Sequence, residues 1–358
     1  MQHVLRRATV AVAALAASVL VTAQAARPQA DAGFGAEIAR LSEPGGSFDT
    51  DNLISNESSY LDVIPALIAR GTTGGAYIGV GPDQNFSYIA RVRPSVAYII
   101  DVRRDNLLLH LLFRALFSEA RNRAEFLSLL TGRAPPGGPT WNTASLKSIV
   151  AYVDGRPASS QVPAIERRLE MVIAAFGVSL SRADFDTIAR FHRSFVNDGL
   201  SLQFHTLNRG PQPYYPTLRD LLLATDASGH PWNYLDLEDD YQFLRSLEGQ
   251  GRVIPVVGDV AGPRAMRAIA ADIGARGERV SAFYISNVEN YLFRDGTFSR
   301  YADNISRLPR TNRSMVIRSV FSGGGQSIQR VQPLELMPND IARGAYRSYY
   351  DLTRASDR

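Results

Sequence analysis

The spacing of hydrophobic residues predicts a sheet of parallel strands with helices between them. Residues 75–80 and 96–100 are short apolar runs without polar alternation, which is typical of strands buried on both faces of a parallel sheet. Helical periodicity over 84–92 joins them, and a strongly apolar helix over 104–117 follows. Strand, helix, strand and helix in this order favour right-handed crossovers.

The same pattern returns in the last third of the chain. Three further strands are predicted, and helices lie between them, at 263–275 and 297–308. The strands span 252–259, 279–286 and 314–321. We therefore predict an α/β fold with a doubly wound, mostly parallel, Rossmann-like sheet.

Between these two parts, residues 121–250 read as a helical insertion. A loop rich in proline and glycine comes first, at 131–142. Helical periodicity then follows at 163–176, 182–196, 217–225 and 238–248, and Ser181 with Asp184 fits a capping box. We expect the insertion to form either a lid over an acceptor site or a separate lobe.

A polar segment with turn residues precedes the first strand. A helix is expected to begin near Glu57, with Ser55 or Asn56 as its cap. Its apolar face would hold Tyr60, Val63, Ile64 and Leu67.

Composition narrows the function classes. Hydrophobic residues make up 45% of the chain and charged residues 21%, which indicates a globular protein with a core. The net charge of +4 comes without a dense basic run, so no nucleic-acid partner is predicted. Cysteine is absent, which excludes disulfides and thiolate chemistry, and the five histidines show no metal-ligand spacing.

The first 25 residues have the three parts of an export signal. "MQHVLRRATV" is basic, "AVAALAASVLV" is apolar and "AQA" is a small-residue cleavage site. We predict cleavage after Ala25 and a periplasmic protein without a stable membrane span; the alternative is an uncleaved membrane anchor. The predicted units are then the signal at 1–25, the Rossmann-like domain at 26–120 and 251–358, and the insertion.

A glycine turn follows the first strand. Gly79 and Gly81 lie where the backbone can approach a ligand and a helix start offers free N–H groups. Asp101 ends the next strand and can accept both hydroxyls of a ribose. A dinucleotide fingerprint would need a third glycine where Gln84 stands. Gln84 and Asn85 instead suit the methionine part of S-adenosylmethionine. The simpler alternative is a plain turn, with Asp101 capping the next helix.

Polar residues also end two later strands. Asp259 could accept from an adenine amino group, while Asn287, Glu289 and Tyr291 follow the strand at 279–286. Because ligands of open α/β sheets bind outside the carboxyl ends of the strands, we expect one cofactor crevice that includes Asp259 and Asn287.

The densest polar cluster precedes the first strand. Asn56 and Glu57, together with Asp49, Asn52 and Ser55, would close over the cofactor, or would form only a turn and helix cap.

Three segments carry a resemblance to a known family. They are "SEPGGSFDTDNLISNESSYL", "GGAYIGVGPDQNFSYIA" and "IIDVRRDN". These segments resemble a bacterial family with a class I S-adenosylmethionine-dependent methyltransferase fold, which includes a biliverdin diester synthase. The resemblance implies the class I methyltransferase type of sheet, a methyl-donor site and tetrapyrrole propionates as acceptors.

Candidate residues for the chemistry depend on the acceptor. A carboxylate acceptor needs a cationic clamp rather than a base, and Arg103 and Arg104 follow the ribose-binding strand closely enough to supply it. Solvated arginines at a helix start are the alternative. For a hydroxyl or amine acceptor, Glu289 is the predicted base, unless it only holds its loop. The aromatic loops "PQPYYP" and "HPWNY" would line an apolar acceptor pocket or pack beneath proline.

The combined prediction is an S-adenosylmethionine-dependent methyltransferase that forms methyl esters on carboxylates of a small acceptor such as a bilin. Export conflicts with this function, because the cofactor is made in the cytoplasm. The alternative is an exported non-catalytic binding or accessory protein that uses the same crevice. An NAD-dependent oxidoreductase comes third, because Gln84 disfavours a pyrophosphate.

Overall fold

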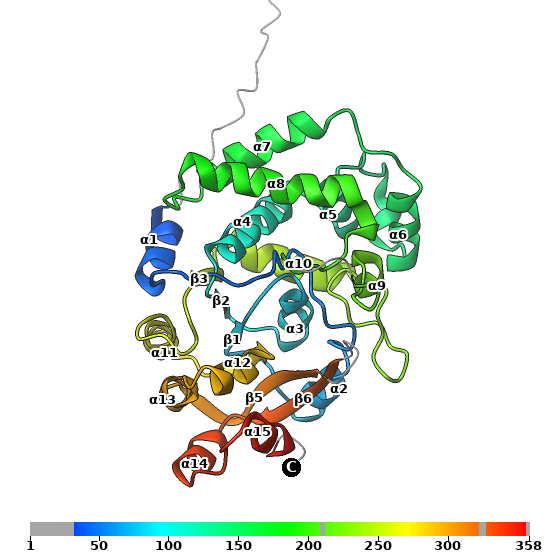
Figure 1. Cartoon of the computed structure of the whole chain (residues 1–358). Helices are drawn as coiled ribbons and strands as arrows, with labels where there is room; N and C mark the ends of the chain where they lie inside the picture. The colour runs from blue at the N-terminus through cyan, green and yellow to red at the C-terminus, as the bar shows by residue number, and fades with distance from the viewer. Residues whose placement is uncertain (1–31, 208–211, 322–326, 356–358) are drawn as a thin grey trace, which may run out of the picture.

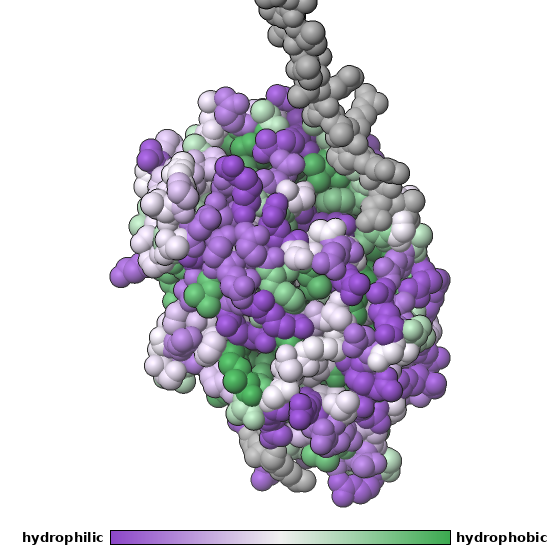
Figure 2. Space-filling view, turned by 180° about the vertical axis from the view of Figure 1, so that it is seen from behind, coloured by the Kyte–Doolittle hydropathy of each residue, from purple (hydrophilic) through white to green (hydrophobic). Residues whose placement is uncertain are grey.

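The computed structural model describes residues 32–207, 212–321 and 327–355 (Figure 1). The predicted export signal at 1–25 lies outside these residues. Within them, no helix combines the length and the apolar character needed to cross a membrane. Polar residues prevail on the face shown in Figure 2, where apolar areas are small and separate.

One six-stranded sheet organises the described chain. Its order is β3-β2-β1-β4-β5-β6, and all neighbours are parallel except β5 and β6. The first five positions follow the order of doubly wound sheets, which confirms the predicted α/β, mostly parallel, Rossmann-like architecture. The strands are β1 (Ala76–Gly79), β2 (Val96–Asp101), β3 (Val253–Val257), β4 (Val280–Ser286), β5 (Arg310–Phe321) and β6 (Ser327–Pro333).

Helices connect the parallel strands, as the periodicity predicts. β1, β2 and β3 are buried almost throughout because helices cover both faces of the sheet, so their sequences show no polar alternation. The connecting helices are α3 (Gln84–Val92), α4 (Arg104–Glu119), α11 (Ala265–Ala275), α12 (Val288–Arg294) and α13 (Phe298–Ser306). The hydrophobic pattern predicts no separate helix for the residues of α12. It predicts only that they follow the end of a strand.

Six α-helices and two short 3-10 helices lie in the described part of the predicted insertion. Figure 1 shows α4 to α8 gathered at one end of the molecule, with the sheet between them and the helices of the other end. Those helices are α11, α13, α14 (Met337–Ala342) and α15 (Tyr349–Ala355). Ser181 and Asp184 form the predicted capping box of α8. The insertion helices are α5 (Arg123–Leu130), α6 (Leu146–Asp154), α7 (Val162–Ala174), α8 (Arg182–Asp198), α9 (Leu218–Leu222) and α10 (Glu238–Gly249).

Two insertion helices, α5 and α6, were not predicted. Every residue of α5 is buried, so the helix has no polar face and shows no amphipathic period. α6 does carry a helical period, with Leu146, Ile149, Val150 and Val153 buried on one face, so its sequence is sufficient to predict a helix there. The remaining helices are α1 (Ala32–Leu41) and α2 (Ile64–Ala69).

The helix expected to begin near Glu57 begins at Ile64 instead, as α2. Pro65 has no N–H to donate to the carbonyl four residues earlier, so it is tolerated only in the first turn of a helix. The expected apolar face is nevertheless buried, because turns carry Tyr60 and Val63 into the core ahead of the helix.

Candidate functional site

A cavity of about 520 Å³ lies at the carboxyl ends of β1, β2, β3 and β4. Its volume falls within the range of about 300–1,000 Å³ found for small-molecule sites. The residues that follow each of these strands line it, and a segment at 47–57, here called the strap, forms another wall. The insertion contributes Phe204, Thr206 and Tyr215. This is the edge at which open α/β sheets bind ligands.

The glycine turn after β1 is held by an asparagine. Asn85 is fully buried; its Nδ2 donates to the carbonyls of Val80 (2.9 Å) and Pro82 (2.7 Å), and its Oδ1 accepts from Tyr77 (2.8 Å). A Cβ on Gly79 would lie 1.9 Å from this Oδ1. Asn85 therefore fastens the turn and does not line the cavity, which corrects its expected role in cofactor binding.

Gly81 lines the cavity in a backbone conformation that favours glycine, with φ of +82°. Beneath it, the imidazole Nε2 of His110 lies 3.0 Å from the Gly81 carbonyl oxygen. Burial lowers the pKa of His110 to about 4, so the ring is neutral at pH 7 and its Nε2–H donates this bond. The turn is thus fixed from below by a core histidine.

Glu57 joins the strap to the sheet through a buried hydrogen-bond network. Its carboxylate accepts from Gln84 Nε2 (3.1 Å) and Gln329 Nε2 (3.0 Å) through Oε2. Through Oε1 it accepts from the Tyr284 hydroxyl (2.8 Å) and the Ser286 hydroxyl (2.5 Å). Gln84 also donates to Tyr284. Glu57 and Gln84 both line the cavity, as does Asn56.

Asp101 and Arg103 form an ion pair at the end of β2. The carboxylate accepts from Arg103 Nη2 (2.8 Å), Nε (3.1 Å) and its backbone N–H (2.8 Å). Arg103 Nη1 also donates to the carbonyls of Thr50 and Asp51, each at 3.1 Å. Both partners line the cavity, but the Arg103 guanidinium is occupied in holding the strap to the sheet.

Further contacts join the strap to the insertion. Thr50 and Thr206 form an antiparallel bridge, and the Leu207 N–H donates to the Asp49 carbonyl at 2.8 Å. His205 Nδ1 lies 3.0 Å from Asp51 Oδ2. Burial raises the pKa of Asp51, and His205 opposes that shift. The strap is therefore clamped between the sheet and the insertion.

The ends of β3 and β4 complete the wall. Asp259 and Asn287 line the cavity as expected, and the Asp259 N–H donates to Glu43 Oε1 at 3.0 Å. Ser286 has φ of +54°, a strained value for a residue with a side chain. At the rim, the Tyr291 ring meets Phe48 edge-on, with centroids 5.1 Å apart.

Besides Gly79 and Asn85, two further predicted site residues do not line the cavity. Glu289 is fully buried in an ion pair with Arg318, with Nε–Oε2 at 2.5 Å, and accepts from the Tyr301 hydroxyl at 2.9 Å. Arg104 donates to Asp184 at 2.8 and 3.0 Å and so ties α4 to α8. The expectation of Glu289 as a base and Arg104 as a substrate clamp is corrected by these contacts.

Sequence reasoning also missed part of the site. Phe48, Phe204 and Thr206 have no local motif that marks them, because they meet the cavity only through the folded strap and insertion. Tyr215 belongs to the aromatic "PQPYYP" loop and does line the cavity. Trp232 of "HPWNY" does not; its Nε1 donates to Asp226 at 2.8 Å.

Comparison with known families identifies the family of this chain. The sequence matches the family described as "Domain of unknown function (DUF7790)" over residues 53–135 and 206–337, which together are more than half of the chain. The chain belongs to the DUF7790 family. No match was found among curated proteins.

The part of the chain that matches DUF7790 holds most of the cavity. It includes the glycine turn, Glu57, Asp101 and the ends of β3 and β4. The unmatched residues 136–205 contain α6, α7 and α8. The sheet-end cavity therefore belongs largely to the family region, whereas these three helices lie outside it.

The cavity of this DUF7790 protein is acidic. Among its described lining residues are five carboxylates and two guanidiniums. Arg103 pairs with Asp101 and Arg294 pairs with Asp295, while no ion pair joins Asp49, Glu57 or Asp259 to a described residue. Net negative charge at the strand ends favours a cationic ligand over a phosphate.

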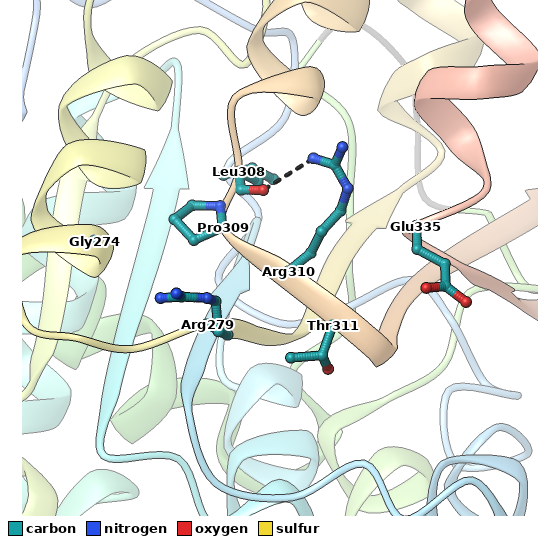
Figure 3. A pocket seen from close by; sticks show the side chains of 7 residues that line it. All are labelled: Gly274, Arg279, Leu308, Pro309, Arg310, Thr311 and Glu335. Carbon is teal, nitrogen blue, oxygen red and sulfur yellow. Dashed lines mark hydrogen bonds between the residues drawn. The ribbon is translucent and has the colours of Figure 1, made fainter.

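A second hollow, of about 680 Å³, lies at the opposite edge of the sheet, beside the amino ends of β4 and β5 (Figure 3). Arg310 is turned back there, and its Nη1 donates to the Leu308 and Ser306 carbonyls, each at 3.0 Å. Arg279 similarly donates to the Glu278 carbonyl at 2.8 Å. These arginines support local backbone, and this edge is not the one where parallel sheets bind ligands.

Proposed function

We propose that the cavity binds S-adenosylmethionine and that the protein is a methyltransferase with the class I type of Rossmann-like sheet. One observation carries the proposal: a buried carboxylate, Glu57, is held by Gln84 at the start of α3. A dinucleotide would bring its pyrophosphate to this helix start and meet a like charge there. A sulfonium ligand would be attracted instead. The family resemblance of the segments around residues 42–106 supports the same cofactor.

Three residues suit the nucleoside part of this ligand. Asp101 Oδ2 accepts one hydrogen bond within the described structure and retains capacity for a ribose hydroxyl. Asp259 and Asn287 offer further acceptors beside the neighbouring strand ends. When bound, S-adenosylmethionine supplies a methyl group on a positively charged sulfur. The protein's part is to position the acceptor and exclude water.

The acceptor would lie toward the rim and the insertion. Arg294 lines the cavity, and its guanidinium lies 4.8 Å from the centre of the Tyr291 ring. We assign this arginine to an acceptor carboxylate because its ion pair with Asp295 is exposed to solvent, with the Arg294 side chain 66% exposed, so a second carboxylate can approach it. The guanidiniums of Arg103 and Arg104 instead hold separate elements of the fold together. Phe204 and Tyr215 offer an apolar wall for the body of an acceptor such as a bilin.

A second candidate is an exported binding or accessory protein without turnover. One observation favours it. The three residues expected to act on an acceptor all form ion pairs within the protein instead: Arg103, Arg104 and Glu289. An oxidoreductase that uses NAD is disfavoured by the acidic cavity.

Binding and transfer assays separate these functions. Calorimetry should show that the purified protein binds S-adenosylmethionine, and labelled cofactor should pass its methyl group to a carboxylate-bearing acceptor such as a bilin. Asp101→Asn should weaken cofactor binding at least about tenfold, whereas Asp105→Asn, a matched change outside the cavity, should not. Binding without transfer would support the accessory function. Binding of NAD in its place would overturn the cofactor assignment.

A further inference from the structure

Glu57 is a buried carboxylate with no cationic partner among the described residues. The residue is 1% exposed, yet it lines the cavity. Across the described residues, no lysine, arginine or histidine forms an ion pair with it. Buried charges in proteins are normally paired, so a charge left open toward a cavity needs a physical reason.

All the side chains that donate to this carboxylate are neutral. Four side chains from α3, β4 and β6 donate to its two oxygens, which is the capacity of an ionised carboxylate rather than of the neutral acid. The strained backbone of Ser286 aims one of these donors at Oε1. Burial raises the pKa of Tyr284 well above its usual value, and the Glu57 charge adds to that shift. The donors replace the hydration of the carboxylate without cancelling its charge.

The position of Glu57 along the cavity indicates which part of a ligand it faces. Asp101 and Asp259 stand at the ends of β2 and β3, on one side of β1. Glu57 is bonded to Tyr284 and Ser286 of β4, on the other side of β1. An adenosine held by the two aspartates would therefore extend its 5′ substituent toward Glu57.

We propose that Glu57 recognises the positive charge of the ligand's 5′ substituent. This rests on the proposed function and adds a residue that selects the cofactor by charge. The group that it contacts is a cation attached to adenosine, either the sulfonium or the α-ammonium of S-adenosylmethionine. An anionic or neutral 5′ substituent would leave the buried carboxylate repelled or unpaired.

Calorimetric titration of three ligands tests this role in the wild type and in Glu57→Gln, which keeps the shape and removes the charge. The ligands are S-adenosylmethionine, S-adenosylhomocysteine and the neutral nucleoside 5′-methylthioadenosine. The variant should bind S-adenosylmethionine at least about tenfold more weakly and methylthioadenosine as the wild type does. S-adenosylhomocysteine, which lacks the sulfonium, identifies the cation: an equal loss assigns the ammonium and no loss assigns the sulfonium.

Two further variants keep the test decisive. Asp259→Asn removes another cavity charge and should weaken S-adenosylmethionine and methylthioadenosine by similar factors. Glu57→Asp keeps the charge and should retain the preference for the cationic ligand, so it serves if the glutamine variant fails to fold. An equal loss of all three ligands in Glu57→Gln, or no loss, would overturn the role of Glu57. If the wild type binds none of the three, the proposed function itself fails.

Discussion

Gly79 shows how a single missing side chain supports the site. The position lies at the end of β1, where a Cβ would enter the space of Asn85 Oδ1. The Asn85 amide donates to the carbonyls of both Val80 and Pro82, so it cannot move away from a new Cβ without breaking these hydrogen bonds. The glycine is required for the asparagine that fastens the turn, rather than for close approach of a ligand.

Replacing Gly79 with alanine should therefore destabilise the protein by about 1–3 kcal/mol through overpacking. Gly249, the last residue of α10, is the matched control, because nothing lies within 4 Å of the position of its Cβ. Gly249→Ala should be neutral or slightly stabilising. Urea unfolding of both variants gives the comparison, and equal stability would contradict this explanation of Gly79.

Two adjacent arginines at the junction of β2 and α4 connect different elements. Arg103 joins the end of β2 to the strap, and its side chain is only 7% exposed. Arg104 joins α4 to the cap of α8, and its side chain is 46% exposed. The hydrogen bonds and charge of Arg104 hold the pKa of Asp184 at about 2. Of these two connections, only the one made by Arg103 lies at the cavity.

Arg103→Lys and Arg104→Lys should consequently differ. Arg103→Lys keeps the positive charge, but the lysine ammonium cannot donate to Asp101 and to both strap carbonyls at once, as the planar guanidinium does. Cofactor affinity should therefore fall at least about tenfold. The lysine at 104 should leave affinity unchanged and alter stability by less than about 1 kcal/mol, as an exposed pair does. Calorimetry and thermal melting measure both effects. Loss of affinity in the Arg104 variant alone would contradict this arrangement.

At the scale of the whole molecule, a second buried acid lies where α1, α4 and α10 meet. Glu248 of α10 is 2% exposed, and its Oε1 has no hydrogen-bond partner among the described residues. Burial raises its pKa to about 8, and Arg114 of α4 opposes the shift. The Arg114 guanidinium lies 3.8 Å from the centre of the Phe34 ring of α1.

This acid makes global stability depend on pH. Because the folded-state pKa exceeds the unfolded one, the folded protein binds the extra proton between about pH 4.5 and 8, and stability falls as pH rises through that window. Glu248→Gln should remove this fall and raise the unfolding free energy at pH 8.5 by on the order of 2 kcal/mol. Denaturant unfolding at pH 5 and 8.5 measures it. As a control, Glu335→Gln at an exposed site should keep the wild-type dependence of stability on pH. The expectation would be contradicted if Glu248→Gln also kept it.

Local pattern sufficed for the order of elements and for the polar strand ends. Runs of apolar residues and helical periods lie within a few neighbours along the chain, so the parallel strands, α3, α4 and α11 could be predicted. Gly81, Gln84, Asp101, Asp259 and Asn287 could be expected at one edge because parallel strands carry their carboxyl ends to the same side. Glycine turns and strand ends thus identified the site's location without a structure.

The partner of each charged side chain was decided only by the tertiary structure. Glu57 takes its donors from 229 and 272 residues away, at Ser286 and Gln329. Glu289 could stand at a strand end as a base by its sequence, but the fold brings Arg318 from β5 against it. No local period records such contacts, because an ion pair or hydrogen bond depends on distances of a few ångströms between segments that the chain itself separates widely.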